Sequence, residues 1–103
     1  MSEQVNHPSH YNREGRKECI DEFVDKYGTG LTALWCVMTA DKYLYRAGAK
    51  DGNSEDQDLK KAMWYMQWAK DHCDLKTYGV QDLYYAVSDK LLKRIQSYYD
   101  PQQ

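Results

Sequence analysis

The sequence predicts an all-α protein: a small bundle of about four helices with a polar N-terminal arm. Apolar residues recur at the i, i+3, i+4 spacing of helices, and no segment alternates strongly enough to form a strand. The two prolines, Pro8 and Pro101, lie near the ends, so the sequence between them is compatible with helix. A chain of 103 residues is expected to form a single domain, residues 1–103.

The first half of the chain is expected to hold the arm and two helices. Residues 1–17 are polar and turn-like, as an arm would be. A short helix over residues 18–27 presents one apolar face and stops at Gly28, because glycine commonly ends helices. A second helix is expected over residues 32–47, followed by a polar loop.

The second half begins with the clearest helix start. Ser54 and Gln57 fit a capping box, in which the Ser hydroxyl accepts from a free backbone N–H and the Gln side chain reaches back. This third helix and the two helices before it make up residues 18–73. The segment 79–103 is expected to form a C-terminal helix, which runs over about residues 81–98.

Charge and hydropathy exclude several classes of function. Lys and Arg total 14 against 16 Asp and Glu, a net charge of −2, so binding of nucleic acid through bulk positive charge is not expected. No apolar run approaches the ~20 residues that cross a bilayer. The N-terminus lacks the basic start and apolar stretch of a signal peptide. The three cysteines lack CxxC spacing and are expected to be reduced thiols, so a cytoplasmic protein is predicted.

The aromatic composition indicates surfaces that are half buried. Ten tyrosines and three tryptophans stand beside one phenylalanine, and rings with a polar tip suit ligand pockets and subunit contacts. The alternative is a core that uses Tyr in place of Phe. Trp64, Tyr65 and Trp68 lie off the expected core stripe of the third helix, so they are predicted to stack on a base or to make contacts in a homo-oligomer.

A local cationic site is predicted near the end of the second helix. Lys42 and Arg46 are one turn apart, and Lys50 follows past the helix end. Such an arrangement on an acidic protein suits a phosphate or carboxylate, and the adjacent Tyr43 could stack on a base. The alternative is that the three cations only complement the negative end of the helix dipole.

A helix hairpin would bring further cations to this site. The loop after the second helix is short enough for antiparallel neighbours, so Lys60 or Lys61 would lie close to Lys42 and Arg46. Flanking aromatic side chains would then wall the pocket.

The polar arm offers neutral hydrogen-bond donors. His7, Ser9, His10 and Tyr11 could surround a phosphate or a base edge, or they could cap neighbouring helices. A zinc site of His7 and His10 with Cys19 lacks a fourth ligand, so no metal is expected there.

The acidic side chains of the first helix give a weaker signal. Glu18, Asp21, Glu22 and Asp25 have the spacing of Mg²⁺-binding helices, but a solvated helix face is favoured because no facing pair repeats the pattern. The sequence also lacks GxxxxGK[ST] and GxGxxG, so no resident cofactor is expected.

Four blocks in order resemble a family of small bacteriophage and prophage proteins. They are His-Pro-Ser-His-Tyr from residue 7, Glu-Cys-Ile-Asp from 18, Lys-Tyr-Leu-Tyr-Arg-Ala-Gly from 42 and Asp-Leu-Lys-Lys-Ala-Met-Trp-Tyr from 58. The resemblance covers residues 5–68, and the family, formally of unknown function, is often labelled "nucleotide kinase". It implies site roles for the arm and for Lys42, Tyr43 and Arg46.

The expected function is therefore binding of a phosphorylated nucleotide or nucleotide-derived signal in the cytoplasm of an infected bacterium. Sequestration of a host defence messenger is one form of that activity. Two alternatives stay open: a nucleoside monophosphate kinase, which would be unusual without a phosphate loop, and a protein that inhibits a host factor through its aromatic surface.

Overall fold

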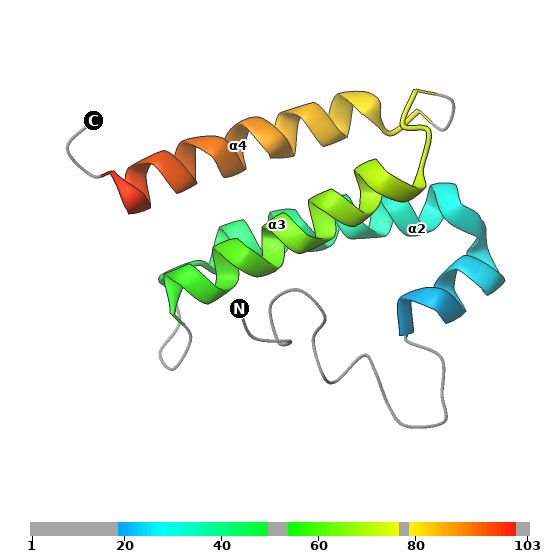
Figure 1. The fold of residues 1–103 in the computed structure, drawn as a ribbon, viewed down its shortest axis with the longest axis horizontal. Helices are drawn as coiled ribbons and strands as arrows, with labels where there is room; N and C mark the ends of the chain where they lie inside the picture. Colours follow the sequence, from blue (N-terminus) through cyan, green and yellow to red (C-terminus); the bar gives the residue numbers. More distant parts are fainter. Residues whose placement is uncertain (1–18, 50–53, 77–78, 101–103) are drawn as a thin grey trace.

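The computed structural model describes residues 19–49, 54–76 and 79–100. Within these residues it contains three helices and no strand: α2 (Cys19–Arg46), α3 (Glu55–His72) and α4 (Gln81–Tyr99). α2 and α3 form an antiparallel hairpin, and α4 lies along one side of that hairpin (Figure 1). The all-α prediction is confirmed. No helix in the described part of the chain is both long and apolar enough to span a membrane.

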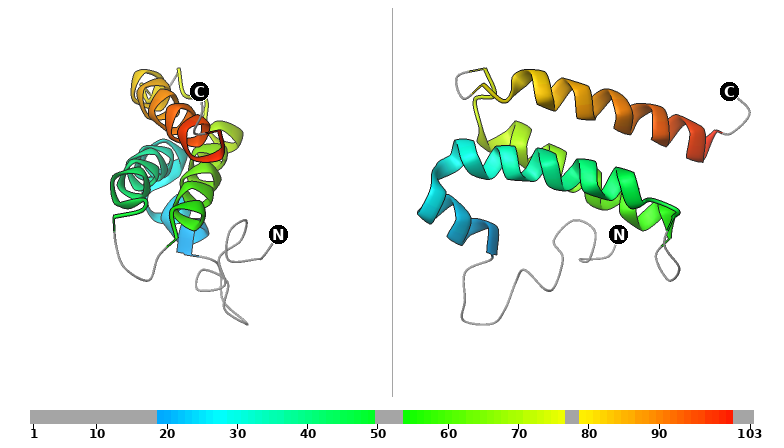
Figure 2. Two further views of the ribbon diagram at one scale, coloured as in Figure 1. Left: turned by 90° about the vertical axis from the view of Figure 1, so that its left-hand side faces the viewer. Right: turned by 180° about the vertical axis from the view of Figure 1, so that it is seen from behind.

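The described residues form three helices and not the four expected, because the first two expected helices are joined in α2 across a kink at Gly28. α2 runs through Gly28, which has non-helical backbone angles of φ 85° and ψ 167°. Only glycine adopts such a conformation without strain, so the sequence located the bend correctly but not its consequence. Thr32 Oγ1 donates to the Gly28 carbonyl at 2.8 Å, and the helix resumes directly. The N-terminal part of α2 therefore turns back beneath the hairpin (Figure 2).

The core lies between α2 and α3 and contains several small buried side chains. Alanine and cysteine let two helix backbones come near each other, while larger residues fill the space on either side. The buried residues of the two helices that make this core include Ala33, Cys36, Val37, Ala40 and Leu44 of α2, and Leu59, Ala62, Tyr65, Met66 and Ala69 of α3. Burial raises the pKa of the Cys36 thiol to about 12, which makes it an unreactive packing residue.

The start of α3 agrees with the sequence prediction. Ser54 is the N-cap residue with extended backbone angles, and its hydroxyl accepts from the Gln57 N–H at 3.0 Å. This contact satisfies one of the backbone donors that a helix leaves free at its first turn. It fixes where α3 begins relative to the end of α2, and therefore which side chains of the two helices meet.

α4 is attached to the hairpin by apolar and polar contacts, and its Tyr84 and Ile95 pack against the core. Its buried residues are Val87 and Leu91. Arg94 donates to the backbone carbonyls of Leu44 at 3.0 Å and Ala47 at 3.2 Å. The same guanidinium pairs with Glu55 at 3.0 Å. This one side chain thus satisfies carbonyl groups at the C-terminal end of α2 and holds that end to the start of α3.

Candidate functional site

Three cations from both helices of the hairpin converge on one tyrosine. The Lys42 Nζ lies 4.7 Å from the centroid of the Tyr43 ring, the Arg46 Cζ lies 5.4 Å from it, and the Lys61 Nζ lies 5.5 Å from it. We call these four residues the cationic cluster. The sequence placed Lys42 and Arg46 one turn apart, and the hairpin adds Lys61 as expected. Lys60 instead pairs with Asp56 at 3.1 Å.

The Tyr43 ring is held in place by an aromatic stack below the cations. Tyr43 is 8% exposed, and its ring stacks on that of Tyr65 at 5.9 Å with 13° between the planes. Tyr65 also meets Trp35 and Trp64 edge-on. A cation over such a ring gains ~0.5–2 kcal/mol, depending on its exposure. The ring therefore organises the cations, and it leaves too little exposed surface for the base stacking predicted for Tyr43.

The burial of Tyr65 contradicts its predicted role in base stacking or subunit contacts. Its side chain is 1% exposed, so it belongs to the core and not to a surface that could bind a base or a second subunit. Trp64 and Trp68 are partly buried and pack against the same core. The oligomer expected from these three residues thus loses its main basis, because their apolar surface is largely covered within one chain.

Asp58 lies beside the cationic cluster and is also 1% exposed. Its Oδ2 is 3.9 Å from Arg46 Nε, and neither carboxylate oxygen has a hydrogen-bond partner among the described residues. Both charges act on Tyr43: burial raises the pKa of the Tyr43 hydroxyl most, Arg46 lowers it and Asp58 raises it. The cluster with Asp58 therefore carries three positive charges and one negative charge.

A hollow of about 330 Å³ adjoins the cluster on the side of α4. It is lined by Lys42 together with Met38, Asp41, Tyr45 and Lys90. Lys90 forms an ion pair with Asp41, which balances those two charges. Lys42 takes no part in that pair, so it is the remaining positive charge in the lining. Tyr45 is 88% exposed and presents its ring at the edge of the hollow. The hollow thus places the Lys42 ammonium group beside one exposed aromatic ring.

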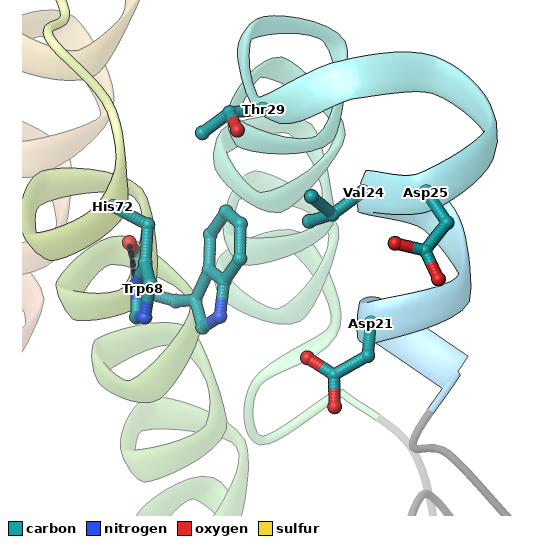
Figure 3. Close-up of a pocket in the computed structure, with 6 residues that line it drawn as sticks. All are labelled: Asp21, Val24, Asp25, Thr29, Trp68 and His72. Atoms are coloured by element: carbon teal, nitrogen blue, oxygen red, sulfur yellow. Dashed lines mark hydrogen bonds between the residues drawn. The ribbon is translucent and has the colours of Figure 1, made fainter.

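A second pocket lies at the opposite end of the hairpin. Its volume is about 370 Å³, and its lining residues are Asp21, Val24, Asp25, Thr29, Trp68 and His72. Figure 3 shows the two carboxylates on the N-terminal part of α2 facing Trp68 and His72 of α3. The His72 ring stacks on the Trp68 ring at 4.3 Å with 14° between the planes.

Among the described residues, no group of three or more His, Cys, Asp or Glu side chains is arranged to hold a metal ion. The acidic residues of α2 that the sequence suggested for Mg²⁺ thus form no such group with the described part of the chain. Trp68 contributes to this second pocket and lies away from the cationic cluster.

Five predicted site residues lie outside the described part of the chain: His7, Ser9, His10, Tyr11 and Lys50. Asp58 was not recognised from the sequence as part of the cationic site. A signal was present, because Asp58, Ala62, Tyr65 and Ala69 follow one another at helical spacing and are all buried. The core stripe expected for this helix included Leu59, Ala62, Met63, Met66, Ala69 and Cys73, so it missed Asp58 and Tyr65 and included Met63, which is exposed.

The comparisons with known proteins identify related phage proteins. The chain is 39% identical over 57 residues to the SaV protein of Lactococcus phage SK1, a match that covers 55% of this chain and 44% of that protein. It is 39% identical over 56 residues to the SaV protein of Lactococcus phage p2, covering 54% and 44%. The match thus spans less than half the length of these relatives. No solved structure matches the chain.

The family comparison covers the part of the chain that forms the cationic cluster. A model described as a protein of unknown function, DUF3310, matches residues 5–67. This range includes α2 and most of α3, and it excludes α4. Together with its phage relatives, the match confirms the resemblance to a small phage protein family, though not the "nucleotide kinase" label. The chain belongs to the DUF3310 family.

Proposed function

We propose that this protein binds a phosphorylated nucleotide, or a signal derived from one, at the cationic cluster. The observation that carries the proposal is the convergence of Lys42, Arg46 and Lys61 from two helices on one tyrosine ring. A guanidinium and two ammonium groups within reach of one point supply the charged donors that phosphate oxygens accept. Three like charges this close repel one another, and an anion between them would remove that repulsion.

The contacts of Arg94 favour this function over simple completion of a helix end. If Lys42 and Arg46 served the C-terminal end of α2, their side chains would be expected at its free carbonyl groups. The carbonyls of Leu44 and Ala47 instead accept hydrogen bonds from Arg94 of α4. Lys42 and Arg46 turn to Tyr43, which leaves their charge available to a ligand.

Two aromatic surfaces beside the cluster could hold the base. Tyr45 borders the hollow next to Lys42, and Trp64 follows Lys61 on α3 by three residues, about one helical turn. Stacking of a base on such a ring gives ~1–3 kcal/mol in nucleic-acid systems and tolerates different bases. The arm residues with His7 and His10, and Lys50, complete the proposed ligand set as donors.

In an infected bacterium, a protein of this kind could hold a host defence nucleotide without altering it, and the host cytoplasm is where we place that activity. The proposal includes an oligomer with the ligand between subunits, because one small bundle offers little concavity of its own. The apolar side chains still exposed for such a contact include three on α2: Leu31, Met38 and Tyr45. Light scattering at micromolar concentration that shows a monomer would contradict this part.

Mass spectrometry of ligand released from protein purified out of phage-infected cells tests the function. We expect an intact phosphorylated nucleotide in stoichiometric amount from the native protein. Much less is expected from Lys42→Gln/Lys61→Gln, whereas Lys70→Gln/Lys93→Gln should retain it, since Lys70 and Lys93 are exposed and lie outside the cluster. Turnover of labelled nucleoside monophosphate would instead favour a kinase. Inhibition of a host protein that survives the Lys42 and Lys61 substitutions would favour the third alternative.

A further inference from the structure

Asp58 is a charged side chain whose burial needs a reason. It is 1% exposed, and neither of its oxygens has a hydrogen-bond partner within the described part of the chain. Burying a carboxylate without such partners costs several kcal/mol, and its attraction to a cation recovers this only when the geometry is good. Here the closest approach is 3.9 Å, from Oδ2 to Arg46 Nε. The pair is thus a poor source of stability, which indicates that Asp58 serves another purpose.

The burial of individual atoms in Arg46 indicates which part of its guanidinium faces Asp58. Its Nε is fully buried and has no hydrogen-bond acceptor among the residues that the structure describes, yet 29% of the side chain is exposed. The exposed area therefore belongs to other atoms of the side chain. Because the guanidinium is planar and rigid, an Nε that faces a carboxylate would fix the direction of the two terminal nitrogens, which form a fork. Such a fork binds a phosphate through two parallel hydrogen bonds.

The charges around the cluster point to one class of phosphate. The three cations Lys42, Arg46 and Lys61 with the one anion Asp58 leave a net charge of +2. The neighbouring charges on α3 are paired, Asp56 with Lys60 at 3.1 Å and Glu55 with Arg94 at 3.0 Å. A terminal phosphate carries about −1.5 to −2 at neutral pH, which matches this charge. A phosphodiester carries a single negative charge and would leave one cation unbalanced.

We propose that Asp58 is a positioning residue for Arg46, and that the site so formed takes a terminal phosphate, a phosphate monoester, in preference to a phosphodiester. This inference rests on the function proposed above. In this arrangement Asp58 does not touch the ligand: its charge orients Nε of Arg46, whose terminal nitrogens would contact the phosphate. Lys42 and Lys61 supply the rest of the charge from the two sides of the hairpin.

Adenosine monophosphate and 3′,5′-cyclic adenosine monophosphate, titrated by calorimetry, test the inference. The proteins are the native chain, Asp58→Asn, Arg46→Lys and the double variant. Asp58→Asn removes a negative charge, so charge alone would tighten anion binding. If Asp58 positions Arg46, the same substitution should instead weaken binding of the monophosphate about tenfold. In the Arg46→Lys background, which has no fork to hold, Asp58→Asn should change the affinity by less than about twofold.

The outcomes separate this inference from the proposed function. If the native protein binds neither nucleotide, both are overturned. If it binds the monophosphate and Asp58→Asn binds equally or more tightly, the function stands and the positioning role is overturned. An equal loss from Asp58→Asn in the native and the Arg46→Lys backgrounds would show a general structural role and also overturn it. The native protein should prefer the monophosphate to the cyclic diester, and the opposite preference would contradict the assigned ligand class.

Discussion

The α2–α3 hairpin and α4 are held in different ways. The hairpin is closed by apolar packing, with buried alanines on both helices and Leu59, which is 0% exposed, on the α3 side. α4 buries few side chains, Val87 and Leu91 among them, and adds polar contacts, of which those of Arg94 are the most extensive. The family match covers the hairpin and stops before α4. The hairpin by itself thus carries the cationic cluster, while α4 satisfies carbonyl groups at the end of α2.

The largest effect is expected from a cavity in the hairpin. Leu59→Ala should lower the free energy of unfolding by about 3–4 kcal/mol, since it removes a fully buried side chain from a packed interface. Leu92→Ala, at a side chain of α4 that is 57% exposed, is the matched control and should cost less than about 0.5 kcal/mol. Urea denaturation measures both. Similar losses for the two variants would remove the distinction between the regions.

A smaller effect is expected when α4 loses its main anchor. Arg94→Met removes hydrogen bonds to two backbone carbonyls and one carboxylate, so we expect a loss of about 1–2 kcal/mol for this partly exposed group. Hydrogen exchange should show lost protection in α4 while the amides of the hairpin core exchange as before. Equal loss of protection in both regions would mean that α4 is an integral part of the core.

The smallest effect concerns the end of α4. Tyr99 donates a hydrogen bond to Asp56, which raises the pKa of Tyr99 to about 12 and lowers the pKa of Asp56. A raised tyrosine pKa stabilises the fold below about pH 10 and loses that effect as the pH rises toward 12. The lowered carboxyl pKa stabilises above about pH 4 and loses that effect in acid.

Melting curves against pH check this contact. Native protein should melt slightly above Tyr99→Phe near neutral pH, and the two should converge in strong acid and in strong base. The phenylalanine keeps the ring and removes only the hydroxyl group. A difference in melting temperature that persists above about pH 12 would show that the hydrogen bond to Asp56 is not its source.

Local patterns predicted much of this fold. The helix class, the cap at Ser54 and the position of the bend at Gly28 each depend on a few neighbouring residues. What the sequence did not reveal was that α2 continues after Gly28. Thr32 bonds back to the Gly28 carbonyl, and Phe23 packs edge-on against Trp35 at 4.9 Å, so the two parts remain one element. These contacts depend on three-dimensional packing that spacing alone does not report.

The candidate site was easier to predict in its cations than in its carboxylate. Lys42 and Arg46 could be placed on one face from helical spacing, and Lys61 followed once a hairpin was assumed. Asp58 shares helical spacing with buried residues, but that signal is weak because a charged residue in the first turn of a helix normally favours solvent and the helix dipole. Its burial follows from the rotation of α3 about its own axis, which also buries Tyr65, and a sequence fixes that rotation only through the complete core.

The central claim is that the cationic cluster binds phosphate, and calorimetric titration with adenosine monophosphate tests it most directly. The comparison is between native protein, Lys42→Gln/Lys61→Gln and Lys70→Gln/Lys93→Gln, since the two variants have the same net charge. We predict at least about tenfold weaker binding for the cluster variant and less than about twofold change for the control, because contacts to charged groups contribute ~1.5–3 kcal/mol and remote charges little. Equal affinities for the two variants would contradict the claim.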